Sequence, residues 1–518
     1  MPENDLRPSD QEHLSGQTTP GFRQISLIAL LPLLLSVVHA AVASQGAPLF
    51  DDALIELMVD EGGPALVEHG HRETPGYAKL MSFGLELGIF WELSTVALIL
   101  AWTLAGLFAS LTASRLGCSD PLSLVACAVL ASTGLQAQYY MNLSTIWGTF
   151  LVPMLLWGVV LWSLRQTSAP SPGVIVPIIT FGVVLSCTFF TNYALPTTIA
   201  ALAVAVGTGT HGTFRRVVWP AALGCGLGLL LWFGLVGDGG ERESVSLMTL
   251  LGALPERLIG VPSSLAEGVW KGTVGLIFDR FGSITFVDAK KATLFGGLTA
   301  AAGFLVARSL GTISRGQQDL KRSWLPALIA IPLATLPIAL TGRSFDTGLH
   351  SRYFLTTLPL LAAVVVGALH LGLRGKIRVP ALLLLLFGCG YTFEIALERH
   401  LDRGRVAHSL SHAVIELHQK HPESHGPSLF YVRGLEKKWP YRSLDWLELT
   451  AAFREEAVGT RGADSTYFRP WSGESAPPPP SMTRPLVYDR GLEVFQGIPD
   501  RVFEARLQES EWEIRQLH

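Results

Sequence analysis

The chain has 518 residues, of which 49% are hydrophobic and 16% are charged, against about 25% charged residues in an average soluble domain. Together with a mean hydropathy of +0.37, this composition argues against an ordinary soluble protein and predicts a polytopic membrane protein. The formal net charge of -3 gives no overall positive charge that would attract nucleic acid, so we expect no nucleic-acid partner.

Apolar runs long enough to cross a bilayer recur along most of the chain. They predict an all-α polytopic membrane protein of about 11 transmembrane helices. The predicted spans are 25–43, 87–111, 121–135, 146–164, 174–190, 193–206, 217–235, 293–306, 325–340, 354–373 and 379–395. We divide the chain into an N-terminal tail (1–22), a transmembrane domain (23–396) with outer loops 44–86 and 237–292, and a C-terminal domain (397–518).

Basic residues gather in alternate short loops, which indicates the orientation. The turns at 138–145 and at Asn192 carry no Lys or Arg. By the positive-inside rule, the N-terminus is cytoplasmic and the C-terminal domain is extracytoplasmic, as for a protein of the plasma membrane or bacterial inner membrane. The basic residues of the opposite connections are Arg115, Arg165, Arg215, Arg216, Arg308, Arg315, Lys321, Arg322, Arg374, Lys376 and Arg378.

The first apolar run ends in Ala41-Val42-Ala43, which has the small-residue spacing of a signal-peptidase site. The run is long, however, and only Arg7 is basic in the tail that precedes it. We therefore predict that it is retained as the first transmembrane helix.

Two adjacent acids, Asp51 and Asp52, follow this helix on the outer side. Carboxylates close to a bilayer are costly, which makes them functional candidates. Asp60, Glu61 and Glu68, further along the same loop, are interpreted as solvated charges. The apolar residues between them predict short amphipathic helices in the membrane interface.

The order of these elements resembles the GT-C class of glycosyltransferases, the group that includes protein O-mannosyltransferases and aminoarabinose transferases. The acid pair resembles the family's Asp-Glu, and the segment Thr74-Pro75-Gly76-Tyr77 resembles part of its His-Pro-Pro-x-Tyr segment without the histidine. The segments "GLQAQYYMNLSTIWGTF", "FFTNYALPTTIAALAVAV" and "HSRYFLTTLPLLAAVVVGAL" are similar to its later outer turns and its Arg-Tyr helix. The resemblance covers about residues 25 to 395.

The resemblance implies transfer of a sugar from a polyprenyl-phosphate carrier to an acceptor, which could be a lipid, a glycan or a protein. It implies that Asp51 is the catalytic carboxylate and that Asp52 supports it. A carboxylate can deprotonate an acceptor hydroxyl, and an arginine suits the phosphate. We expect Arg352, Arg343, Tyr353 and Tyr77 to bind the donor and its lipid phosphate; the alternative for Arg352 and Tyr353 is an interfacial anchor.

The turn that holds a second acid or an arginine in many family members holds Asn142 and Ser144 here. A divalent ion prefers several anionic oxygens, and only the first loop offers them. We therefore predict no metal site and no cofactor, and a divalent metal ion stays an open alternative.

The tail predicts a small α/β domain that helps to choose the acceptor. The strands are expected in "SLFYVRG" and "PLVYDRG", with a helix in "LDWLELTAAFREEA" between them and another helix over 394–419. His408 and His412 would share one helical face, but no third metal ligand is apparent, so surface histidines are the preferred interpretation.

The alternative to an enzyme is a non-catalytic polytopic protein, either a transporter or an assembly partner in the export of envelope polysaccharide. A transporter should carry ionisable groups near the membrane midplane. Few charges fall there, and the polar groups gather at the outer rim, which favours chemistry at the interface.

Overall fold

The structure is a computed structural model, and it describes the helices and strands of part of the chain. The predicted spans 193–206 and 293–306 and the predicted outer loop 237–292 lie outside these parts, and the predicted spans 146–164, 174–190 and 325–340 lie mostly outside them. The described residues are 22–43, 45, 50–64, 75–133, 151, 155, 158, 179–184, 219–236, 308, 311, 324–330, 358–373, 375–421, 426–435, 446–460, 465–471, 486–487, 493–495, 499–508 and 511–517.

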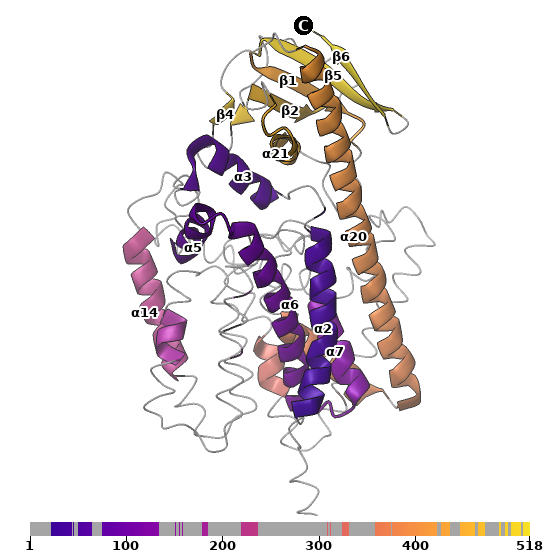
Figure 1. The fold of residues 1–518 in the computed structure, drawn as a ribbon. Coiled ribbons are helices and arrows are strands. Elements are labelled where there is room, and N and C mark those ends of the chain that lie inside the picture. Colours follow the sequence, from indigo (N-terminus) through magenta and orange to yellow (C-terminus); the bar gives the residue numbers. More distant parts are fainter. Residues whose placement is uncertain are drawn as a thin grey trace, which may run out of the picture.

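Apolar helices form a bundle below a small α/β domain (Figure 1). Helix α6 packs against α2, α7 and α19. Alanines recur at every fourth position of α6 and are buried, so neighbouring backbones can approach closely. The helices of this part are α2 (Phe22–Ala43), α3 (Phe50–Gly62), α5 (Pro75–Glu86), α6 (Phe90–Arg115), α7 (Pro121–Thr133), α14 (Trp219–Val236), α19 (Leu358–Gly372) and α20 (Gly375–Lys420).

Gly106 marks the closest approach within this bundle. A Cβ atom at this position would lie 2.7 Å from Cγ of Pro32 on α2 and 2.9 Å from the carbonyl oxygen of Ala128 on α7. These are distances that Cβ atoms do not adopt, so only glycine lets the three helices meet here.

The outward surfaces of several described helices are apolar. Such side chains are unfavourable in water and suit contact with lipid. Among the described residues, only α6 is both long and apolar enough to cross a membrane by length and composition, while parts of α2, α7, α14 and α19 are shorter apolar helices. The exposed residues include Leu30, Leu34 and Val38 on α2, Leu227, Leu230 and Leu231 on α14, and Leu383, Leu384 and Phe387 on α20.

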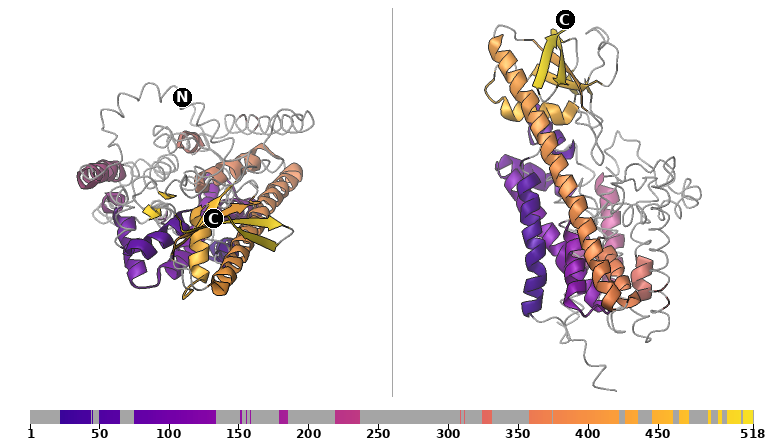
Figure 2. Two further views of the ribbon diagram at one scale, coloured as in Figure 1. Left: turned by 90° about the horizontal axis from the view of Figure 1, so that it is seen from above. Right: turned by 90° about the vertical axis from the view of Figure 1, so that its right-hand side faces the viewer.

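Helix α20 connects the bundle to the C-terminal domain (Figures 1 and 2). It has 46 residues and is therefore about 69 Å long. The predicted last span and the predicted tail helix are one continuous helix, because no helix-ending residue separates the apolar run from the polar one. Pro380 lies in its second turn, where the helix lacks the backbone hydrogen bond that an N–H at this position would donate to the carbonyl of Lys376.

The C-terminal domain contains a four-stranded sheet in the order β2-β1-β5-β6, in which β1 is parallel to β2 and β5, and β6 is antiparallel to β5. The predicted strand "PLVYDRG" does not join it, since its residues Leu486 and Val487 pair with β4 in a separate two-stranded sheet. The strands are β1 (Ser428–Arg433), β2 (Thr466–Pro470), β3 (Leu486–Val487), β4 (Glu493–Phe495), β5 (Arg501–Gln508) and β6 (Glu511–Gln516), and α21 (Trp446–Glu456) lies between β1 and β2.

Strand β1 is buried on both faces, as its unbroken apolar run requires. Phe430 and Val432 belong to a hydrophobic core with α20 and α21. Leu429 and Tyr431 belong to a second core, which also contains residues of α3 and α5. The sheet therefore lies between the long helix and the first outer loop.

Candidate active site

The acid pair opens helix α3, which begins a few residues after α2 ends. Asp51 and Asp52 are in the first turn of α3, where unpaired backbone N–H groups and the helix dipole favour negative charge. Negative charge is therefore less costly at this position than elsewhere along a helix. The side chain of Asp51 lies outside the described part of the structure.

Asp52 is buried, with 3% of its surface exposed. It is not isolated, since it takes part in at least one polar or electrostatic interaction. Burial of a carboxylate is unfavourable unless partners compensate for the lost water. An aspartate that served only to end or begin a helix could stay exposed to water and would not need to be buried.

Helix α3 lies between the bundle and the C-terminal domain (Figure 1). Leu54, Leu57 and Met58 are completely buried, and α3 packs against α21 of the C-terminal domain. The amphipathic helix predicted for a membrane interface is therefore covered by protein on much of its surface. Its partner, α21, comes almost 400 residues later in the chain.

Tyr77 belongs to the same hydrophobic core as α3. It lies in the first turn of α5, is 6% exposed and takes part in at least one interaction. The structure thus brings Tyr77 and the helix of the acid pair into one cluster, which also contains Phe90 at the start of α6. Arg343, Arg352 and Tyr353 lie outside the described residues, so their positions relative to α3 stay predictions.

A buried ion pair lies where α20 meets α21. The Nη2 atom of Arg403 is 2.6 Å from Oε2 of Glu448, and the two side chains are 10% and 6% exposed. Glu448 is in the first turn of α21, the helix on which α3 packs. The ion pair therefore fixes the helix that supports the acid pair.

Sequence reasoning did not single out Arg403, although a signal for it exists. Ala407, Leu410 and Val414 form a buried stripe on α20 with helical spacing. Arg403 occupies the next position of that stripe towards the N-terminus, and a charge in an apolar stripe indicates a buried partner.

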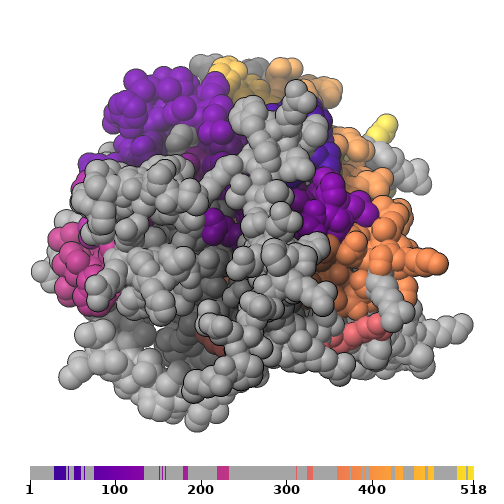
Figure 3. Space-filling model, turned by 90° about the horizontal axis from the view of Figure 1, so that it is seen from below, coloured from indigo at the N-terminus to yellow at the C-terminus, as the bar shows by residue number. Residues whose placement is uncertain are grey.

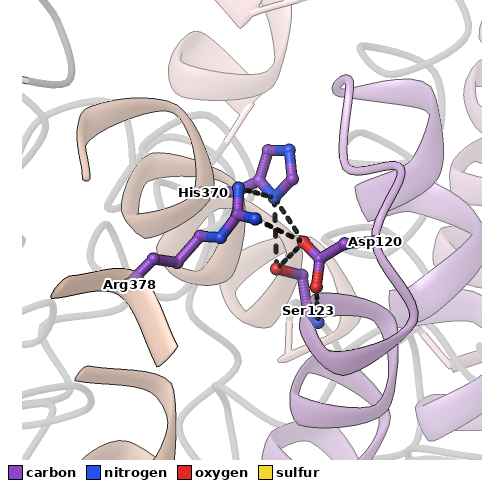
Figure 4. A network of polar contacts seen from close by, with 4 residues as sticks. All are labelled: Asp120, Ser123, His370 and Arg378. Carbon is purple, nitrogen blue, oxygen red and sulfur yellow. Dashed lines mark hydrogen bonds and ion pairs between the residues drawn. The ribbon is translucent and has the colours of Figure 1, made fainter. Parts of the chain in front are cut away.

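A second polar network lies at the other end of the bundle, where α7 and α20 begin (Figure 4). The Nδ1 atom of His370 is 2.7 Å from Oδ2 of Asp120 and 3.1 Å from Nη1 of Arg378. Ser123 donates its hydroxyl hydrogen to Asp120 at 2.6 Å and lies 3.2 Å from Nδ1 of His370. These contacts join α7, α19 and α20.

Asp120 stays ionised in this network. Burial raises the pKa of its carboxyl, but the hydrogen bonds from Ser123 and the charges of Arg378 and His370 outweigh it, and the net pKa is lowered. Asp120 also caps α7 by accepting the backbone N–H of Ser123 at 2.9 Å. The network thus holds the helix ends together, far from the acid pair; Figure 3 shows this end of the molecule, with α14 (magenta) and α20 (orange) on opposite sides.

No protein-family model, no curated protein and no solved structure matches this chain. Among the described residues, no group of three His, Cys, Asp or Glu side chains surrounds a point where a metal ion could sit. The resemblance to the GT-C class accordingly rests on the motifs quoted above.

Proposed function

We propose that the protein is a membrane glycosyltransferase of the GT-C type, which moves a sugar from a polyprenyl-phosphate carrier to a lipid, glycan or protein acceptor on the extracytoplasmic side. The observation that carries this proposal is the burial of Asp52 at the start of α3, between the bundle and the C-terminal domain. A carboxylate that is withdrawn from water close to a membrane is a candidate for a catalytic role, because its burial is not needed for solubility.

In the proposed reaction, Asp51 accepts the proton of the acceptor hydroxyl as its oxygen attacks the anomeric carbon. The bond between that carbon and the phosphate oxygen breaks, and the polyprenyl phosphate leaves with the bonding electrons. Asp52 orients the acceptor or Asp51. No oxidant, reductant or cofactor is needed for this exchange.

The leaving phosphate gains negative charge, which a fixed cation would stabilise. We assign this role to Arg352, with Arg343 as a second cation, and we assign contacts with the donor to Tyr353 and Tyr77. The guanidinium of arginine can hold two phosphate oxygens at once. The burial of Tyr77 in the core that holds α3 supports a place for it close to the acid pair.

The apolar outer surfaces of α2, α14 and α20 support a membrane location, with lipids as direct partners. The carrier would enter from the bilayer at the level of the α2–α3 connection. The acceptor would come from the outer side, where the C-terminal domain covers α3.

The test is sugar transfer by purified protein in lipid nanodiscs, with a panel of polyprenyl-phosphate sugars as donors. Asp51→Asn keeps the side-chain shape and should reduce transfer by at least about 100-fold, since it removes the general base. Glu86→Gln is the matched control, because Glu86 is an exposed acid at the end of α5 and should tolerate the change. Normal turnover by the Asp51→Asn, Asp52→Asn double variant would refute the proposal.

A further inference from the structure

We propose that α5 lies in the extracytoplasmic membrane interface, with Leu80, Phe83 and Leu87 inserted among the acyl chains of the lipids there. The three side chains are 46%, 57% and 53% exposed. They are three and four residues apart, so they form one stripe along the helix. The inference rests on a membrane location and does not depend on the proposed sugar transfer.

The opposite face of α5 is covered by protein. Tyr77 and Met81 belong to the hydrophobic core that also contains Leu54 and Leu57 of α3. A helix that buries one face in protein ordinarily turns polar side chains outward, whereas α5 turns large apolar side chains outward as well. Removal of these side chains from water is favourable, and a lipid surface supplies the apolar medium that this requires.

A glycine turn holds α5 against the start of α6. Gly88 has a φ of 66°, a conformation that favours glycine, and the N–H of Ile89 closes the turn by donating to the carbonyl of Gly84 at 3.1 Å. Gly84 itself lies so close to the first residue of α6 that an added Cβ atom would be 3.3 Å from Cδ2 of Phe90. Figure 1 accordingly shows α5 beside the upper end of α6, below α3.

The length of α6 places this turn at the membrane surface. Its 26 residues span about 39 Å, whereas the hydrocarbon core of a bilayer is about 30 Å thick. Along one face of α6, the exposed Glu92 is followed at intervals of four by the exposed apolar residues Val96 and Leu100. The hydrocarbon boundary therefore falls between Glu92 and Val96, which leaves the turn and α5 at the level of the lipid headgroups.

Charged residues border the stripe on one side. Lys79 and Glu86 are exposed and lie seven residues apart, so they share one flank of α5. Lysine side chains at such a position extend their charged ends towards water and headgroups while their stems stay on the apolar surface. Helix α5 thus presents one face to protein, one to lipid and one to water, as expected of a helix in the interface.

The test is a photo-crosslink in the full-length protein, reconstituted in phosphatidylcholine nanodiscs. The photoreactive residue p-benzoylphenylalanine replaces Phe83, and lipid adducts are measured by mass spectrometry after irradiation. The same probe at Val458, an exposed apolar residue that follows α21, is the matched control. We expect at least about 10-fold more lipid adduct at Phe83 than at Val458, the preference that burial of one large apolar side chain supplies.

Two further positions complete the experiment. The probe at Leu80 should give the same lipid adducts as at Phe83, and the probe at Leu384, an exposed residue of α20 in the bundle, reports contact with lipid independently. Equal adduct yields at Phe83 and Val458 would overturn the inference, and so would adducts at Phe83 with a second protein chain in place of lipid. Sugar transfer is not part of this measurement, so its failure would be distinct from failure of the proposed function.

Discussion

Asp52 brings a carboxylate to a place that water hardly reaches. The start of α3 supplies partial positive charge, which makes such a position tolerable. It does not explain why the side chain is buried, on a helix that packs against α21 of the C-terminal domain. An asparagine or serine would cap the same helix at lower electrostatic cost, so the pair of acids points to a requirement for charge.

Arg352 provides a test of the phosphate role at the scale of one residue. We predict that Arg352→Lys lowers the rate of transfer or the affinity for the donor, although it keeps the positive charge. A lysine acts as a point charge and cannot make a paired contact with two phosphate oxygens. Full activity of both Arg352→Lys and Arg352→Ala would show instead that the residue is an interfacial anchor.

His418 makes the stability of the C-terminal domain depend on pH. Burial, followed by the charge of Arg501, lowers the pKa of His418 below its usual 6.5. As the pH falls below 6.5, the unfolded chain takes up a proton before the folded one, so the folded state loses stability. We expect this loss to stop below the lowered pKa of the folded state.

Thermal unfolding across this pH range checks the expectation. His418→Gln removes the titrating group and can keep a hydrogen bond with Thr466, whose hydroxyl oxygen lies 3.0 Å from Nε2 of His418. The variant should show a shallower loss of melting temperature on acidification. An unchanged pH dependence in the His418→Gln variant would contradict this explanation.

At the scale of elements, the contact of α2, α6 and α7 depends on Gly106. We predict that Gly106→Val lowers the free energy of unfolding by about 1–3 kcal/mol, because the added atoms overlap Pro32 and the backbone of Ala128. Gly226→Val is the control, since nothing lies within 4 Å of a Cβ at that helical position. Equal effects of the two changes on the unfolding midpoint would contradict this explanation.

Local pattern in the sequence accounts for some elements and not for others. The apolar runs lie where α2, α6, α7, α14, α19 and the first part of α20 are helical. Strand β6 alternates Trp512 and Ile514 with charged residues, a period-two signal that the sequence reasoning overlooked. The short strand β2 shows no such alternation. It is a strand because it pairs with β1, which its own sequence does not reveal.

The packing of α3 on α21 was not predictable from local pattern. The buried face of α3 is amphipathic, and a membrane surface and a protein surface select the same pattern. The acid pair itself was visible in the sequence because like charges are unusual beside an apolar run. The ion pair of Arg403 and Glu448 needed knowledge of which helices meet.

At the scale of the whole molecule, α20 joins two polar ends. It begins in the network of Asp120, His370 and Arg378 and reaches the C-terminal domain through Arg403. The right-hand view of Figure 2 shows it running the length of the bundle. A helix continuous over this length places the C-terminal domain at the opposite end from the start of α20, which carries Lys376 and Arg378.

This arrangement predicts the orientation in the membrane. The N-terminus should be cytoplasmic and the C-terminal domain extracytoplasmic, because the basic residues remain inside. An alkaline phosphatase fused after His518, which requires export for activity, should be active, and a reporter that works only in the cytoplasm should be inactive at the same place. The reverse pattern would put Asp51 and Asp52 on the wrong side for a lipid-linked donor facing outward.

The most direct measurement for the proposed function is an experimental structure of the protein in nanodiscs with a polyprenyl phosphate analogue. We predict phosphate density beside the start of α3, with Arg352 in contact with the phosphate and the prenyl chain against the apolar surface of the bundle. Lipid phosphate density elsewhere, with Arg352 facing away and Asp51 in contact only with water, would contradict the account.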